Sequence, residues 1–329
     1  MKKIHLLVLL LITSCSNALY IDMQDSYNSY GEREGLKGPV HSICQVTYLI
    51  DSINQNNEII KGNIATTLTN ACYKLDSLLN IIYSYEINPS GGIQYKKKYA
   101  YEYDAWNRIV AKYFYTESWQ FDDDTNIKSD FKLYEKDSYK YDENGNLCCW
   151  TRSEPDGQIF NMTIYEFDLN GKLTKRVQKD STDKVLNSEM IKYDRLRNRI
   201  IKKEYYLNNL YNSKTIERHF IDRKKIKVFD TKTKVRDIYE FYYNSNGRVI
   251  KEMLYNKKGK VTGLWLNQYN EKNELISQEF YNVTSGKLLE LEINRKYIFK
   301  YDAFGNWNTK VFYDKGKPIE ITERQIEYK

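Results

Sequence analysis

Aspartate is the residue type in this chain that recurs in a pattern able to do chemistry. Carboxylates that converge in space can act as general acid and general base, and Asp104, Asp142, Asp168 and Asp302 each directly follow a Tyr or Phe. The same Asp returns unit after unit in one sequence context. We therefore interpret its main role as accepting backbone N–H bonds across a tight turn, rather than as acid–base catalysis.

Histidine and cation-binding patterns give catalysis little support. Beyond residue 35 the histidines are His41 and His219, and His219 stands three residues before Asp222, in a slot that aromatic residues fill elsewhere. Residues 142–146 resemble the start of a calcium loop, but the twelfth position is Ser153 instead of the required bidentate Glu. We expect no enzymatic activity, no cofactor and no metal; a hydrolase whose site the sequence does not reveal is the alternative.

A repeated phrase organises the chain. Each copy has an apolar or aromatic pair, a key Asp or Asn, a turn of four residues and an aliphatic residue. One interval, from 142 to 168, is 168 − 142 = 26 residues. The key residues are Asp76, Asp104, Asp142, Asp168, Asp194, Asp222, Asn244, Asn270 and Asp302. Three positions later, six copies carry Gly145, Gly171, Gly247, Gly305, Asn107 or Asn273, the residue types that best accept a left-handed backbone.

Each copy predicts a β-hairpin. Strand side chains alternate, so Tyr101 and Tyr103 share one face and carry the packing. The key Asp caps the turn, and the third turn residue is predicted to have a positive φ. A second kind of turn, seen at Gly157 and Gly259, joins one hairpin to the next.

The phrase Y-x-Y-D-x-x-G-x-L resembles the YD repeat of the RHS family, from about residue 70 to the end. That resemblance implies an all-β protein: an elongated or curled antiparallel β-meander of tandem hairpin repeats, with a superhelix as one form that it could take. We assign residues 36–329 to this domain, with an atypical N-terminal cap at about 36–70. Nine hairpins are expected to be too few for a closed shell, and the resemblance carries over neither a toxin nor an enzyme.

The N-terminal residues predict export of the protein and its location in the cell envelope. Met1-Lys2-Lys3 is a basic n-region, and residues 6–12 form an apolar run too short for a transmembrane helix. Ile12-Thr13-Ser14-Cys15 resembles a bacterial lipobox, which implies a signal peptide at 1–15 and an acylated Cys15. An ordinary signal peptide that happens to contain Cys is the alternative. Ser16 favours the outer membrane by the enterobacterial sorting rule, with surface or periplasmic display left open. Residues 16–35 are predicted to be a polar tether.

Composition agrees with a β-rich envelope protein. The chain has 31 Tyr, 15% aromatic residues and only 4 Pro, and its net charge is a mild +7. Lys and Arg alternate with Glu along the strands, which indicates a solvated sheet face and not a nucleic-acid groove. Among the cysteines, Cys44 and Cys72 are the pair to test for a disulfide; four buried thiols are the alternative. Adjacent Cys148 and Cys149 point to opposite faces and suit a bridge poorly.

The predicted partners follow from the anchor and from the aromatic surface. We expect a membrane contact through Cys15, no nucleic acid, and binding of an extended glycan or protein along a face rich in Tyr and Trp. A purely structural envelope protein is the alternative. An insertion at 117–124 breaks the repeat, so its aromatic and acidic residues are the candidate ligand site, unless the insertion only lengthens a hairpin. These residues are Trp119, Phe121, Asp122, Asp123 and Asp124.

Overall fold

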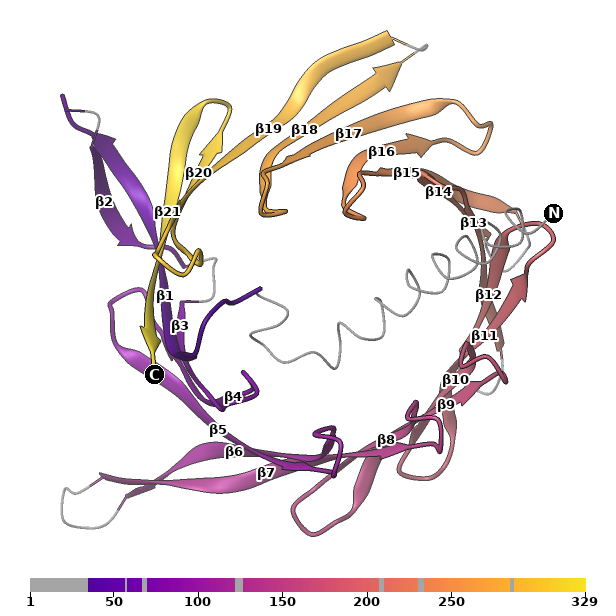
Figure 1. Cartoon of the computed structure of the whole chain (residues 1–329), viewed down its shortest axis with the longest axis horizontal. Helices are drawn as coiled ribbons and strands as arrows, with labels where there is room; N and C mark the ends of the chain where they lie inside the picture. Colours follow the sequence, from indigo (N-terminus) through magenta and orange to yellow (C-terminus); the bar gives the residue numbers. More distant parts are fainter. Residues whose placement is uncertain are drawn as a thin grey trace, which may run out of the picture.

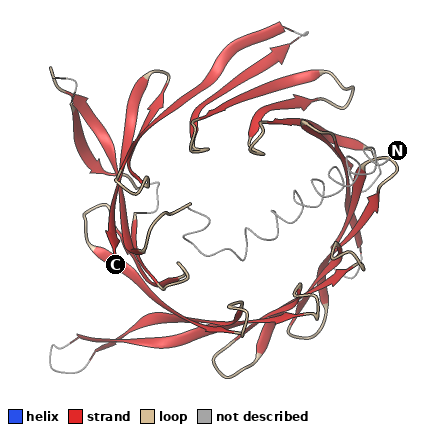
Figure 2. Cartoon of the chain, in the orientation of Figure 1, coloured by secondary structure: helices blue, strands red, loops and turns tan. Residues whose placement is uncertain are grey.

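The protein folds as one antiparallel β-sheet (Figure 2). The computed structural model describes residues 35–56, 58–66, 70–121, 127–206, 210–229, 234–284 and 287–329, and every regular element within these ranges is a strand. The first ten strands are β1 (Val40–Ile53), β2 (Ile59–Ile64), β3 (Ala71–Leu75), β4 (Ile81–Ile87), β5 (Ile93–Tyr103), β6 (Ile109–Phe121), β7 (Ile127–Tyr141), β8 (Leu147–Ser153), β9 (Ile159–Phe167) and β10 (Leu173–Asp180). The others are β11 (Val185–Asp194), β12 (Arg199–Tyr206), β13 (Leu210–His219), β14 (Arg223–Phe229), β15 (Val235–Tyr243), β16 (Val249–Tyr255), β17 (Val261–Tyr269), β18 (Leu275–Thr284), β19 (Lys287–Tyr301), β20 (Trp307–Asp314) and β21 (Lys317–Tyr328).

Strand β1 closes the sheet into a barrel. One edge of β1 pairs with β21, from Val40↔Tyr328 to Leu49↔Glu320. The other edge pairs with β3 and, further along, with β2. From β3 to β21, each strand pairs with the next in sequence. The closed ring therefore contains 21 − 1 = 20 strands, all except β2, which extends β1 as a hairpin.

The predicted all-β antiparallel meander of hairpins is confirmed. Of the predicted elongated, curled and superhelical forms, the sheet curls until it closes as a barrel, so the superhelix and the expectation of an open array are wrong. That prediction treated the ends of the array as open and nine repeat turns as too few to close. Each turn brings two strands, and twist and tilt accumulate from strand to strand. The last strand therefore meets the first. Such a meeting is a long-range property, and no local sequence pattern encodes it.

The two ends of the barrel differ in shape. Figure 1 shows the repeat turns inside the outline of the ring, whereas the loops that join one hairpin to the next lie on that outline or project beyond it. We call the first end the inner rim and the second the outer rim. The inner-rim turns are 76–80, 104–108, 142–146, 168–172, 194–198, 220–222, 244–248, 270–274 and 302–306. The described outer-rim turns are 54–56, 88–92, 154–158, 180–184, 256–260 and 314–317. The barrel tapers toward the inner rim.

A fully buried core is confined to the start of the ring. Val40, Ile43 and Leu75 are buried there, with Leu36 and Tyr73 packed against them. Elsewhere most strand side chains are half-buried. The sheet is therefore held by its backbone ladder and by cross-strand pairs; the rings of Tyr99 and Phe114, for example, stack with centroids 5.4 Å apart.

The predicted turn geometry is confirmed at the inner rim. All six Gly and Asn residues at the third turn position have positive φ: Gly145 (82°), Gly171 (71°), Gly247 (75°), Gly305 (85°), Asn107 (60°) and Asn273 (63°). Leu79 has the same conformation, with a φ of 61°. A leucine is costly there, and its packing against the Val40 cluster offsets that cost.

Candidate functional site

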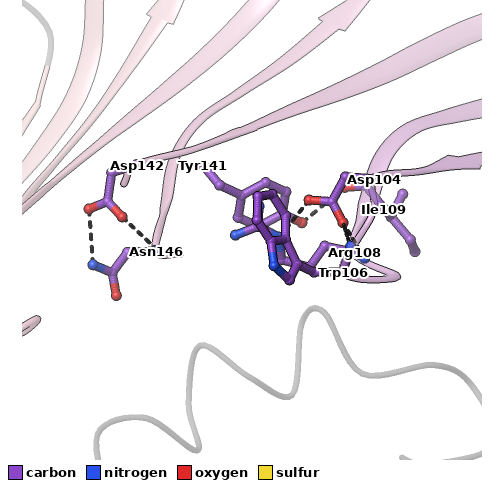
Figure 3. A network of polar contacts seen from close by, with 7 residues as sticks. All are labelled: Asp104, Trp106, Arg108, Ile109, Tyr141, Asp142 and Asn146. Carbon is purple, nitrogen blue, oxygen red and sulfur yellow. Dashed lines mark hydrogen bonds and ion pairs between the residues drawn. The ribbon is translucent and has the colours of Figure 1, made fainter. Parts of the chain in front are cut away.

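The key Asp or Asn is a turn acceptor in eight of the nine inner-rim turns. The prediction is wrong at Asp222, because the turn 220–222 precedes this residue and β14 begins directly after it. In Asp142, Oδ1 accepts the backbone N–H groups of Asn144 (3.0 Å) and Asn146 (2.8 Å), and Oδ2 accepts the Asn146 side-chain amide at 2.9 Å (Figure 3). The Asn146 amide and these backbone donors lower the pKa of the Asp142 carboxyl group. Asp142 is therefore ionised at neutral pH and suited to capping rather than to proton donation.

The Tyr before the turn bonds the neighbouring hairpin. Backbone pairing between β6 and β7 ends at Ala111↔Ser138, short of Ile109. The Tyr141 hydroxyl group donates to the Ile109 carbonyl oxygen at 2.9 Å, in the place of a ladder bond. The equivalent bonds are Tyr193 to Leu173 O (2.9 Å) and Tyr269 to Val249 O (3.0 Å). The repeat Tyr thus joins adjacent hairpins where their strands part.

At one inner-rim turn, an arginine packs between aromatic rings and pairs with the key Asp. The Arg108 guanidinium lies 4.8 Å from the Trp106 ring centre and 4.2 Å from that of Tyr141, and Arg108 Nε is 2.6 Å from Asp104 Oδ2 (Figure 3). These contacts combine cation–π attraction with an ion pair. Trp106 itself is 76% exposed. The turn is therefore rigid while its large aromatic tip faces solvent.

At the inner rim, Lys37, which lies just before β1, also contacts the turn of the last repeat. Asn306 is 5% exposed; its Oδ1 accepts the Lys37 backbone N–H, and its Nδ2 donates to the Lys37 carbonyl, both at 2.7 Å. The same amide contacts the Tyr328 hydroxyl at 2.8 Å, and that hydroxyl donates to Asp302. The Phe304 ring stacks on Tyr328 at 4.1 Å. A Tyr–Asp contact of the repeat type thus helps to close the ring.

An open depression of about 540 Å³ lies across β17, β18 and β19. Its lining combines aromatic, amide and charged side chains. It is lined by Gln268, Asn270, Ile276, Ser277, Glu279, Asn294, Lys296, Tyr297, Ile298, Phe299 and Tyr301. Pairing between β18 and β19 ends at Ser277↔Lys296. The depression therefore occupies the space where these two strands diverge toward the inner rim.

The depression coincides with a departure from the repeat. At β5, the Tyr101 hydroxyl donates to the Ile81 carbonyl at 2.8 Å. Phe299 holds the equivalent slot, three residues before the key Asp302, and has no hydroxyl group. The Tyr301 hydroxyl bonds the side chains of Asn270 and Glu274, as the Tyr103 hydroxyl bonds those of Asp76 and Asn80 in the earlier copy. Burial and the Glu274 bond raise the pKa of Tyr301 to about 12, so this hydroxyl stays protonated.

The lining of the depression suits binding better than catalysis. Tyr297, Phe299 and Tyr301 offer aromatic faces, while Gln268 and Asn294 offer amides that both donate and accept hydrogen bonds. A few polar groups among aromatic walls are typical of ligand sites. In the described residues, no group of three or more His, Cys, Asp or Glu side chains is placed to hold a metal ion.

The most strongly shifted carboxyl group lies elsewhere, on β13. Burial alone would raise the pKa of Glu217, but the neighbouring His219 and the charges of Lys202 and Lys224 lower it to about 2. Lys202 Nζ lies 3.0 Å and His219 Nε2 lies 3.4 Å from the Glu217 carboxylate. Glu217 is therefore an ion-paired structural anion at neutral pH.

The residues of the predicted ligand site are only partly described. Trp119 and Phe121 lie in β6, with their backbones opposite Ser129 and Ile127. The insertion therefore lengthens the hairpin of β6 and β7. The side chains of Trp119 and Phe121 lie outside the described structure, as do Asp122, Asp123, Asp124 and Cys15. Ligand binding at the insertion and lipidation of Cys15 stay predictions.

A disulfide joins Cys44 on β1 to Cys72 on β3. The two residues are directly opposite each other in the register of the two strands, as the sequence suggested. Cys148 and Cys149 are free and half-buried, and burial raises the pKa of the Cys149 thiol. The bridge ties the strand that closes the barrel to its first repeat.

Comparison with known proteins gives limited similarity. No protein-family model matches the chain, and no curated protein sequence is similar to it. A porin-like protein from Bacteroides uniformis aligns with a TM-score of 0.30 and 10% identity over 88% of this chain and 98% of that one. The TcdB2-TccC3-Cdc42 complex (0.28, 12%) and the Photorhabdus luminescens Tc holotoxin pore (0.28, 13%) align over 83% and 84% of this chain. The chain spans 15% of the length of each of these toxin chains. At these TM-scores the alignments assign neither a family nor a function.

Sequence reasoning missed the depression, although two signals mark it. The interval from Asn270 to Asp302 is 302 − 270 = 32 residues, longer than the common repeat. Phe299 stands in a slot that Tyr holds in the copies ending at Asp104 and Asp142. Neither signal is specific alone, because the interval from Asp104 to Asp142 is 142 − 104 = 38 residues and Phe241 holds the same slot before Asn244. The combination of the two signals in one repeat is found only before Asp302.

Proposed function

We propose that this protein is a non-enzymatic, YD-repeat-like scaffold of the bacterial cell envelope that binds an extended glycan across β17–β19. The observation that supports this most is the depression, where three aromatic rings and the amide side chains of Gln268 and Asn294 meet on the sheet. Aromatic faces stack on the apolar faces of sugar rings, and amides match the paired donors and acceptors of sugar hydroxyl groups. An open depression also lets a chain enter and leave at both sides.

The binding test uses the full chain and a panel of envelope glycans. Gln268→Ala combined with Asn294→Ala removes two lining amides and is expected to weaken binding by about tenfold or more, because each lost hydrogen bond to a sugar is worth roughly 1 kcal/mol. Gln158→Ala, an exposed amide of the outer rim, is the matched control and should bind normally. Unchanged affinity in the double variant would reject this site, and absence of any glycan binding would reject the function.

A second variant fills the depression instead of emptying it. Phe299→Tyr restores the hydroxyl group that Tyr101 uses to bond the neighbouring strand. The added group is expected to bond the backbone of β18, to raise the thermal midpoint slightly and to weaken glycan binding. Binding that stays normal in this variant would place the glycan away from Phe299.

The envelope location rests on the proposed anchor at Cys15. Cys15→Ala should abolish incorporation of labelled fatty acid and move the protein from the detergent phase into the aqueous phase. Equal labelling of the variant and the wild type would reject the lipoprotein proposal. Among the described residues, none forms a helix with the length and hydrophobicity that crossing a bilayer requires.

A purely structural envelope protein is the second candidate. It is favoured by the repeat Tyr side chains, because the hydroxyl groups of Tyr141, Tyr193 and Tyr269 are all used to join hairpins. Under this candidate the chain binds neither glycan nor protein, and the double variant at Gln268 and Asn294 behaves as the wild type in every assay. The glycan panel therefore separates the two functions.

A further inference from the structure

Large apolar side chains gather at the tips of the inner-rim turns. Trp106 is 76% exposed, and Leu169, Leu196 and Ile221 are each at least 94% exposed. Phe304 is 49% exposed in the turn after Asp302. Exposed apolar tips that cluster at one end of a molecule mark an interaction surface. We call these five residues the apolar tips.

The outer rim has a different composition at the same kind of turn. Its described turns carry Asn, Gln, Asp, Lys, Ser, Thr, Gly, Glu and Pro, and no large apolar residue stands at their tips. Both rims are built from turns with the same backbone hydrogen bonds; for example, Gly145 donates to Asp142 O and Gly259 donates to Asn256 O. The folding of a turn therefore does not require an apolar tip. The apolar tips of the inner rim are therefore not explained by the folding of the turns.

The chain start indicates what this rim faces. Asn306 holds Lys37 at the inner rim, so the chain enters the described structure at this end of the barrel. The proposed lipid attachment at Cys15 is 37 − 15 = 22 residues from Lys37, a reach of at most about 75 Å. The path from the proposed anchor is therefore shorter to this rim than to the outer one.

We propose that the inner rim docks on the lipid bilayer, with the apolar tips inserted at the level of the lipid headgroups and the outer rim turned away from the membrane. Trp is suited to this depth because its ring is apolar and its indole N–H stays hydrated. Interfacial binding strengthens with the apolar area buried, so several separate tips act together. The depression at β17–β19 is then held at a fixed orientation to the surface. The choice of rim rests on the proposed anchor.

The experiment measures binding to phosphatidylcholine vesicles by sedimentation, with the full chain carrying Cys15→Ala so that no acyl chain contributes. The test variant adds Trp106→Ser, Leu169→Ser and Leu196→Ser. The matched control adds Ile93→Ser, Tyr134→Ser and Tyr206→Ser, three large side chains that are also more than half exposed but lie outside the inner-rim turns. Every arm keeps the same N-terminal segment, so its own affinity for lipid cancels.

The test variant is expected to lose about tenfold or more in vesicle partitioning, with the control unchanged and both thermal midpoints close to that of the parent. Equal partitioning of parent, test variant and control would overturn the proposal. A loss confined to the control would place the membrane contact outside the inner-rim turns and would also overturn the proposal. Fatty-acid labelling of Cys15 is measured separately, so failure of the anchor is distinguished from failure of the docking rim.

Discussion

The inner and outer rims use the same turn but differ in what surrounds it. On the outer rim, Asn256 Oδ1 accepts the N–H groups of Lys258 and Lys260 at 3.0 Å, as Asp142 does on the inner rim for its own turn. On the inner rim, side chains of one turn reach the next: Asn246 donates to Asn273 at 2.9 Å, and Lys272 Nζ contacts Gly305 O at 3.2 Å. Each turn is therefore formed by bonds within its own residues. Neighbouring repeats are held together by different bonds, which the repeat Tyr and the turn side chains make.

The largest expected difference between the rims is at Asn306. Asn306→Ala leaves the backbone N–H and C=O of Lys37 and the Tyr328 hydroxyl without this partner in a buried place, which should cost about 3 kcal/mol. Asn256→Ala on the outer rim loses only its own turn bonds and should cost about 1 kcal/mol. Urea unfolding measures both. Equal losses would show that lateral contacts add nothing to the inner rim.

The backbone strain of the turn should not distinguish the rims. Gly171 on the inner rim and Gly157 on the outer rim have φ values of 71° and 92°. Gly171→Val and Gly157→Val are each expected to destabilise the fold by about 1 kcal/mol or more, and each by more than Lys172→Val. Thermal midpoints check this. A loss at Gly171 alone would mean that the outer turns are not ordered as described.

The hydroxyl group that joins two hairpins has a smaller effect. Tyr141→Phe removes only the bond to the Ile109 carbonyl and should cost about 1 kcal/mol in urea unfolding. Tyr95→Phe removes a hydroxyl group from a side chain that is 66% exposed, and should have no measurable effect. If the two variants are equally stable, the bond to Ile109 does not help to hold the rim.

The smallest effect concerns pH. The pKa of Asp142 is lowered in the folded protein, so its contribution to stability is present above the unfolded pKa of about 3.9 and is lost as the pH falls. Asp142→Asn keeps the acceptor oxygen, as Asn244 and Asn270 do in their own turns. The stability difference between wild type and variant should be largest near neutral pH and shrink below about pH 4. A difference that does not change with pH would assign it to packing.

The sequence predicts the local parts of this fold and not its long-range parts. The hairpins, the key Asp as acceptor and the positive φ at Gly171 follow from residue types and spacing, because each depends on a few neighbouring residues. The meeting of β1 with β21 joins positions far apart in the chain, and the depression depends on how two hairpins diverge. The outer-rim acceptors Asn54, Asn88 and Asn256 were also missed. Asn54 and Asn88 follow Ile instead of Tyr, whereas Asn256 follows Tyr255 and stands three residues before Gly259, as in the repeat phrase.

Hydrogen exchange tests the central claim most directly: the inner rim is held together by contacts between repeats, whereas the outer rim is held only turn by turn. The amides of Asn146 and Lys172 on the inner rim and of Lys184 and Lys260 on the outer rim all donate to the side-chain oxygen of a turn residue. If contacts between repeats hold the inner rim, its amides should exchange about tenfold more slowly. Equal exchange at both rims, or faster exchange at the inner rim, would contradict the account.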